Sequence, residues 1–241
     1  LSRILGLKAS LNLHIKSIDE LVPNEVNNQL LLDNQKRRDD LSDKTITLVQ
    51  DKVNLLPINP KDHKKIGIVY YSTPNTMDIV MKNIPGVKGM LIKALSGLSK
   101  KKTHAKMLVE SLNKRGFQAF EHSFGDIFKI IKENKGSLEE WKDKFDLIII
   151  LSKIETASNQ TSLQVSYKAM GFDAPWWVKE VPTILVSVAN PYQQYDFPMI
   201  DTVINTYTAK ESNYPIIVKK LLGESDFKGT SPVSLEFKEN I

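Results

Sequence analysis

From about residue 65 to the end of the chain, short apolar runs alternate with amphipathic segments. Five runs are predicted to be strands, over 66–71, 117–123, 146–151, 182–188 and 202–207. Helices are predicted between and after them, over 103–116, 124–143, 161–180 and 214–222. Continuously apolar strands separated by helices are typical of a parallel sheet that is covered on both faces. The pattern therefore predicts an α/β fold, a Rossmann-like three-layer sandwich with a mostly parallel sheet, preceded by a helical linker.

The first 40 residues follow a different pattern. Residues 1–16 carry spaced apolar side chains and are predicted to form an amphipathic helix, whereas 17–38 are polar and Asn-rich and are predicted to be a linker. A second helix is expected over 42–52, with Ser42 as its N-cap. We therefore divide the chain into a leading helix and linker (1–40) and an α/β domain (41–241).

The loops that follow the strands are the expected location of a ligand, because parallel sheets bind ligands at the carboxyl ends of their strands. Glu155 follows the most apolar strand, and Asn190, held extended by Pro191, follows the next one together with Tyr192. Glu155 is either a ligand contact or a solvent-facing loop residue, the commoner role of a charged side chain. Asn190 and Tyr192 either contact a ligand or form a rigid turn, and the sequence leaves both open.

Standard catalytic and cofactor motifs are missing from the sequence. It contains no GxGxxG, GxxxxGK[ST], GxSxG or HExxH pattern and no cysteine, and its four histidines are far apart. We therefore predict no cofactor and no metal site. Glycoside cleavage usually needs two carboxylates, and Glu155 has no partner carboxylate in the strand-end loops. His122 follows a strand but is more simply a surface or hydrogen-bonded histidine.

The charge composition limits the classes of binding partner that we expect. The 33 Lys and Arg residues are offset by 28 Asp and Glu, and the densest basic run, 100–102, has no interleaved aromatic residue. We therefore expect no nucleic-acid partner. The alternative, nucleic-acid binding through this basic run, predicts a DNA affinity that falls steeply with salt.

No apolar run approaches the ~20 residues of a membrane span. The chain begins at Leu1 and lacks a signal-peptide pattern. We expect a processed product or a cut piece, and the compartment, cytoplasmic or exported, stays open.

Several segments stand in the order of a known family. They are RILGLKASLNL (3–13), SDKTITLVQDKVNLLPINP (42–60), KKIGIVYYS (64–72), DLIIILSKIETASNQTSLQ (146–164), Asn-Pro-Tyr (190–192), Asp-Phe-Pro (196–198), Thr-Tyr (206–207), Gly-Glu (223–224) and FKGTSPVS (227–234). Together they resemble the C-terminal domain of glycoside hydrolase family 3 and the helix that leads into it. The resemblance covers nearly the whole chain, and Asn-Pro-Tyr favours the branch similar to β-N-acetylhexosaminidases over the β-glucosidases.

The resemblance implies a function for the parent protein rather than for this chain alone. In that branch the catalytic aspartate and an Asp-His pair lie in an N-terminal TIM-like barrel, and neither motif is present here. The chain is then expected to hold no catalytic residue and to stabilise or cover the active site of the barrel, its partner in the same polypeptide. The implied parent is a bacterial retaining hydrolase that releases terminal N-acetyl-hexosamine from an amino-sugar glycoside, in carbohydrate metabolism and cell-wall recycling.

The resemblance also suggests substrate contacts. Candidates in the strand-end loops are Glu155, Asn159, Gln160, Asn190 and Tyr192. In the β-glucosidase branch a glutamate of this domain is the acid/base; Glu155 stands at about that place, but the Gly-rich pattern around it is missing and the role is not carried over. The alternative is a free-standing carbohydrate- or partner-binding α/β module without catalysis. A barrel encoded directly upstream of Leu1 would favour the first interpretation, and a start codon there the second.

Overall fold

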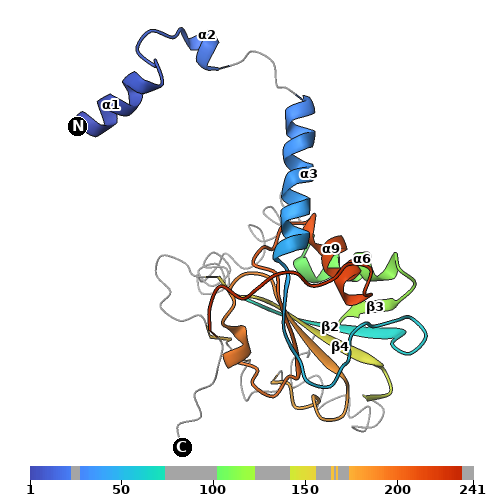
Figure 1. The fold of residues 1–241 in the computed structure, drawn as a ribbon. Helices are drawn as coiled ribbons and strands as arrows, with labels where there is room; N and C mark the ends of the chain where they lie inside the picture. Colours follow the sequence, from blue (N-terminus) through green and yellow to red (C-terminus); the bar gives the residue numbers. More distant parts are fainter. Residues whose placement is uncertain are drawn as a thin grey trace, which may run out of the picture. The chain divides into compact units, whose positions relative to one another are not determined.

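The computed structural model describes residues 1–22, 28–73, 102–122, 142–155, 164–165, 167 and 174–234 (Figure 1). The chain divides into two compact units, Leu1–Arg38 and Asp39–Ile241. The first unit holds α1 (Ser2–Ser10), α2 (Ile18–Leu21) and most of α3 (Asn28–Thr45), and none of these helices contains a buried residue. Within the described ranges, no helix is long and apolar enough to cross a bilayer.

The second unit is built on a six-stranded sheet in the order β1-β6-β5-β4-β2-β3. The strands are β1 (Thr47–Asp51), β2 (Lys65–Ser72), β3 (Gln118–Glu121), β4 (Leu147–Lys153), β5 (Thr183–Ser187) and β6 (Thr202–Asn205). β1 pairs antiparallel with β6, whereas the other four pairs are parallel. This arrangement confirms the predicted α/β class with a mostly parallel sheet.

The alternation of side chains along β4 shows why its sequence is uninterruptedly apolar. Leu147, Ile149 and Leu151 pack on one face, against α6 (His104–Asn113) and α9 (Asn213–Leu221). Ile148 and Ile150 pack on the other face, beside Trp177 and Phe197. Successive strand residues point to opposite faces, so a strand that is buried on both faces needs apolar residues at every position. α6 and α9 lie close to the bounds predicted for them, 103–116 and 214–222. Gly116 and Gly223 follow these helices with φ of 90° and 70°.

Three predicted elements need correction. The prediction of a helix over 42–52 is wrong, because α3 ends at Thr45 and β1 begins at Thr47. The linker expected over 17–38 is largely helical, since α3 already begins at Asn28. The described end of the helix predicted over 161–180, residues 174–180, forms turns instead. The helix predicted over 124–143 lies almost wholly outside the described residues.

Candidate functional site

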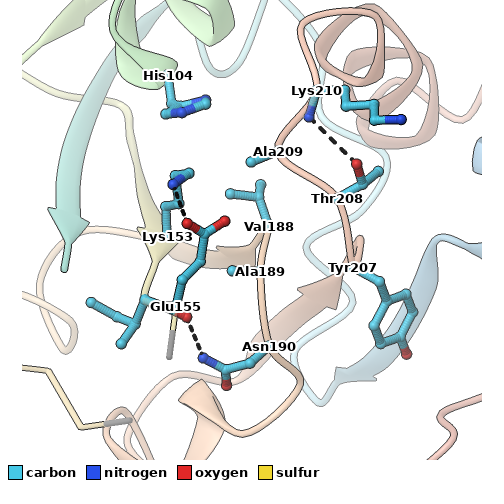
Figure 2. A pocket seen from close by; sticks show the side chains of 11 residues that line it. His104, Lys153, Glu155, Val188, Ala189, Asn190, Tyr207, Thr208, Ala209 and Lys210 are labelled. Atoms are coloured by element: carbon cyan, nitrogen blue, oxygen red, sulfur yellow. Dashed lines mark hydrogen bonds and ion pairs between the residues drawn. The ribbon is translucent and has the colours of Figure 1, made fainter. Parts of the chain in front are cut away.

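A cavity of about 590 Å³ opens at the carboxyl edge of the parallel strands (Figure 2). Its wall consists of the last residue of β4 and of residues that follow β4, β5 and β6, together with the first residue of α6. These residues are His104, Lys153, Ile154, Glu155, Val188, Ala189, Asn190, Tyr207, Thr208, Ala209 and Lys210. Apart from His104, the lining comes from the ends of the strands and from the loops that follow them, where the sequence predicted a ligand to lie.

Glu155 is held at this edge by its main chain. Its amide donates to the Thr73 hydroxyl at 2.7 Å, and the same hydroxyl donates to the Glu155 carbonyl at 3.1 Å. Its side chain is 53% exposed, and the carboxylate lies 2.6 Å from the Lys153 ammonium. The two charged groups meet at the cavity wall (Figure 2). The oxygens of a carboxylate in this position can accept hydrogen bonds.

Asn190 joins the segments that follow β4 and β5. Its side-chain amide donates to the Ile154 carbonyl at 2.6 Å, and its side-chain oxygen accepts from the Tyr192 amide at 2.9 Å. The Ser187 hydroxyl donates to the Asn190 carbonyl at 2.6 Å. These bonds make the rigid turn that was one of the two interpretations of Asn-Pro-Tyr. Asn190 still lines the cavity, so its main role in the structure is to shape the wall.

The structure brings only part of the predicted site together. Glu155 and Asn190 line the same cavity. Tyr192 is joined to Asn190 through its backbone, its side chain is 40% exposed, and it is absent from the described cavity lining. Asn159 and Gln160 lie outside the described residues.

His104 is a cavity residue that the sequence analysis did not select. Its Nδ1 lies 2.8 Å from the hydroxyl of Tyr214, a residue that is buried on α9. Burial, and then the nearby Tyr70, raises the pKa of Tyr214, so its hydroxyl keeps its proton at neutral pH. A buried hydroxyl proton needs an acceptor, which favours Nδ1 as the acceptor in this contact. The sequence pattern that could have pointed to His104 was its position at the start of a predicted helix, beside the carboxyl edge of the predicted sheet.

Tyr70 lies beside this pair, with its ring centroid 6.2 Å from that of His104. Burial raises the pKa of Tyr70, and the charges of Glu155 and Glu121 raise it further, against the lowering effect of its hydrogen bond with Ser72. The phenol group therefore stays protonated at neutral pH and adds a neutral polar group near the ion pair of the cavity.

The turn after β6 forms the opposite wall. Tyr207 has a φ of 58°, a left-handed conformation that is uncommon for a bulky residue. Its hydroxyl lies 3.1 Å from the Thr47 hydroxyl at the start of β1. The Asn213 side chain donates to the Thr208 carbonyl at 2.9 Å. Contacts to β1 and to α9 therefore hold this wall in place.

A buried polar cluster supports the turn that follows β5. The Ser152 hydroxyl donates to the Gln193 side-chain oxygen, and the Gln193 amide donates to the Asp196 carboxylate at 3.2 Å. The same carboxylate accepts from the Val165 amide at 3.2 Å. Burial raises the pKa of Asp196, and the hydrogen bond from Val165 partly offsets this effect. The aspartate of the Asp-Phe-Pro motif is thus a structural anchor of this turn.

The remaining candidates have structural partners. The His122 ring packs edge-on against Phe145, with centroids 5.1 Å apart. Lys102, at the end of the basic run, forms a 2.7 Å ion pair with Glu110. Among the described residues, no group of three or more His, Asp or Glu is arranged to hold a metal ion. Glu155 is the one carboxylate in the described cavity lining, which is one fewer than the two-carboxylate mechanism of glycoside cleavage needs.

Known proteins resemble the chain along nearly its whole length. No family model matches it. A Beta-N-acetylglucosaminidase/beta-glucosidase of Cellulomonas fimi is 28% identical over 235 residues, which are 96% of this chain and 37% of that protein. The solved structure of "Beta-glucoside phosphorylase BglX" is 28% identical with a TM-score of 0.71, again over 96% of this chain and 37% of the other.

A more distant structure has the same fold. A glycoside hydrolase family 3 beta-N-acetylglucosaminidase from Paenibacillus sp. str. FPU-7 is 16% identical with a TM-score of 0.52, over 95% of this chain and 37% of that chain. The chain therefore spans little more than a third of the length of these relatives. Sequence and fold agree that it matches the C-terminal part of a glycoside hydrolase family 3 protein.

Proposed function

We propose that this chain is the C-terminal α/β domain of a retaining glycoside hydrolase of the β-N-acetylhexosaminidase-like branch. In this proposal residues 1–40 are the interdomain helix and linker, and 41–241 are the domain that stabilises a preceding TIM-like barrel and covers its active site. The observation that carries the proposal is the match to 96% of this chain but to only 37% of a protein named as a beta-N-acetylglucosaminidase/beta-glucosidase. The rest of such a protein has ample length for a catalytic barrel.

The cavity supports the covering role. Its lining comes mainly from strand-end loops, and it combines Glu155 with Lys153 and His104. A carboxylate that is fixed in place can accept hydrogen bonds from sugar hydroxyls, and a loop edge that closes over a barrel excludes water from the reaction. We propose Glu155, Asn159, Gln160, Asn190 and Tyr192 as the residues that face the sugar, an amino-sugar glycoside of the kind processed in bacterial cell-wall recycling.

The leading helices support the place of the chain in a longer polypeptide. In α1, Ile4, Leu5 and Leu7 are 60%, 53% and 62% exposed. Isolated helices of this length are marginally stable in water unless an apolar face is buried by packing. The proposal assigns the burial of these side chains to the barrel that precedes them.

The proposed contact of Glu155 is tested in the longest product of the gene that encodes this chain. Glu155→Gln removes the charge while keeping the shape, and it is expected to raise KM for a chromogenic N-acetyl-β-glucosaminide about tenfold, because a hydrogen bond to a charged group is lost. Glu110→Gln is the matched control, since Glu110 is also exposed and also pairs with a lysine, Lys102. An unchanged kcat/KM in Glu155→Gln would remove this glutamate from the site.

A second candidate is phosphorolysis of a β-glucoside. It is favoured by the 28% identity and TM-score of 0.71 to a structure named as a beta-glucoside phosphorylase. The two candidates differ in the nucleophile that releases the sugar, water or inorganic phosphate. Turnover of the chromogenic N-acetyl-glucosaminide and glucoside with and without phosphate separates them. A sugar 1-phosphate that forms only with phosphate favours the phosphorylase, and free sugar at a phosphate-independent rate favours the hydrolase.

A further inference from the structure

The main chain beyond β4 is held by side chains rather than by the strand ladder. β4 ends at Lys153, whose carbonyl accepts a last ladder-like bond from the Thr73 amide at 3.2 Å. The next two residues, Ile154 and Glu155, are outside the strand. The Ile154 carbonyl and both backbone groups of Glu155 nonetheless have partners, and these partners come from the ends of the strands on either side, β2 and β5.

Thr73, just beyond the end of β2, supplies the contacts on one side. A single hydroxyl both accepts from the Glu155 amide, at 2.7 Å, and donates to the Glu155 carbonyl, at 3.1 Å. A hydroxyl has one proton to donate and two lone pairs to accept, and this pair of bonds uses the proton and one lone pair. The two bonds fix both the amide and the carbonyl of the same residue, which restrains the direction of its Cα–Cβ bond.

Asn190 supplies the contact on the other side. Its side-chain amide donates to the carbonyl of Ile154 at 2.6 Å. Asn190 is itself held by the Ser187 hydroxyl and by the Tyr192 amide, at 2.6 Å and 2.9 Å. The peptide that precedes Glu155 is therefore fixed from β5, while the residue itself is fixed from β2.

The backbone that carries the Glu155 carboxylate is therefore held in place from both sides. The Glu155 side chain leaves a clamped backbone, and its end is paired with the Lys153 ammonium at 2.6 Å. An exposed side chain on a loose loop would lose much of its conformational freedom on binding a ligand, whereas a preorganised one loses less. Interactions of this kind are the means by which a site holds a polar group within a fraction of an ångström of its productive position.

We propose that Thr73 is a positioning residue, which acts through the backbone of Glu155 to aim its carboxylate into the cavity at the carboxyl edge of the sheet. This inference rests on the proposed function, because it gives Glu155 a ligand to contact. It adds a residue from the end of β2 to a site that is lined from the ends of β4, β5 and β6, and it assigns the Thr73 side chain a role that depends on its hydroxyl and not on its bulk.

The test uses the longest product of the gene, with five variants, one of which is Glu155→Gln alone. Thr73→Val keeps the shape of the side chain and removes the hydroxyl, Thr73→Ser keeps the hydroxyl, and Thr73→Val is also combined with Glu155→Gln. Thr230→Val, at an exposed threonine of the C-terminal segment, is the control for the same substitution elsewhere. The readouts are KM and kcat for the chromogenic N-acetyl-β-glucosaminide and hydrogen exchange in the peptide that holds Glu155.

The positioning role predicts a specific pattern. Thr73→Val raises KM about tenfold, as expected when a contact group is misplaced, and it speeds exchange in the Glu155 peptide. Thr73→Ser stays within about twofold of the parent, and the double variant is no worse than Glu155→Gln alone, because both changes remove one interaction.

Two other outcomes overturn the inference and can be told apart. If Glu155→Gln raises KM and Thr73→Val does not, or if their effects simply multiply, Thr73 does not act through Glu155 and the proposed function stands. If Glu155→Gln itself leaves KM unchanged, the proposed contact of Glu155 fails, and the role of Thr73 fails with it.

Discussion

The two units of the chain use their apolar residues in opposite ways. In α1 no residue is buried, and Ile4, Leu5 and Leu7 are more than half exposed. In β4 every residue from Leu147 to Ser152 is buried. Both segments are recognisable from their apolar pattern, so the pattern predicts which side chains need burial but not whether this chain provides it. The α/β unit supplies its own core, whereas the described helices of the leading unit bury none of their residues.

The largest expected effect is in the core. Ile149 is fully buried at the centre of β4. Ile149→Ala is expected to lower the free energy of unfolding by about 3 kcal/mol, because it removes buried methyl groups and leaves a cavity. Urea denaturation of the 241-residue chain measures the loss. A cost below about 1 kcal/mol would mean that the α/β unit is not tightly packed around this strand.

A smaller loss of folding stability is expected when Lys220 is replaced. Its side chain is fully buried on α9. Its ammonium donates to Ser225 at 2.9 Å and to the Asp226 carbonyl at 2.5 Å, and it lies 3.2 Å from Asp43 at the end of α3. Lys220→Ala is expected to cost about 2 kcal/mol, because these groups lose their partner. Lys219→Ala, an exposed neighbour on the same helix, is the control and should change stability by less than about 0.5 kcal/mol.

The same contact predicts a pH dependence. Burial alone would raise the pKa of Asp43, but hydrogen bonds from Ser225 and Lys220, with the charges of Lys220 and Lys228, lower it below the ordinary value of 3.8. A lowered pKa in the folded state gives stability that is present above the unfolded pKa and lost as the pH falls through the folded one. The parent should therefore be more stable to unfolding than Asp43→Asn at neutral pH, and this difference in stability should shrink as the pH falls below 3.8. An advantage that is constant from pH 6 to pH 3 would contradict this pKa direction.

The smallest effect is expected in the leading unit. Leu5 is 53% exposed in α1. Leu5→Ala is expected to change the free energy of unfolding of the 241-residue chain by less than about 0.5 kcal/mol. In the longest gene product the same change should cost more than about 1 kcal/mol, since a preceding barrel would bury this side chain. Equal effects in the two proteins would argue against docking of α1 on a barrel.

The sheet was predictable where the local pattern and the tertiary environment agree. The strands over 66–71, 146–151 and 182–188 are buried on both faces, so their apolar runs identify them. β1 was mistaken for a helix, because Ile46, Leu48 and Val49 fit a helical face, and its pairing with Thr202–Asn205 lies far away in the sequence. α3 was taken for a linker because it buries nothing and therefore lacks an apolar face.

The site was predictable in position but not in its bonds. Parallel topology places the residues after β4 and β5 at one edge, which is why Glu155 and Asn190 line the same cavity. The sequence cannot state that the Asn190 amide turns to the Ile154 carbonyl, or that Thr73 reaches Glu155, because each bond joins segments that only the folded sheet brings together. His104 was passed over because metal-site spacing was the criterion, whereas its partner is the buried Tyr214.

The most direct test compares hydrolysis of a chromogenic N-acetyl-β-glucosaminide by the 241-residue chain and by the longest product of its gene, at equal concentration. We expect turnover in the longer product and none above the buffer rate in the chain alone, because the described cavity lining contains a single carboxylate. Turnover by the chain alone that is lost in Glu155→Gln would contradict the account, since the chemistry would then lie in this domain.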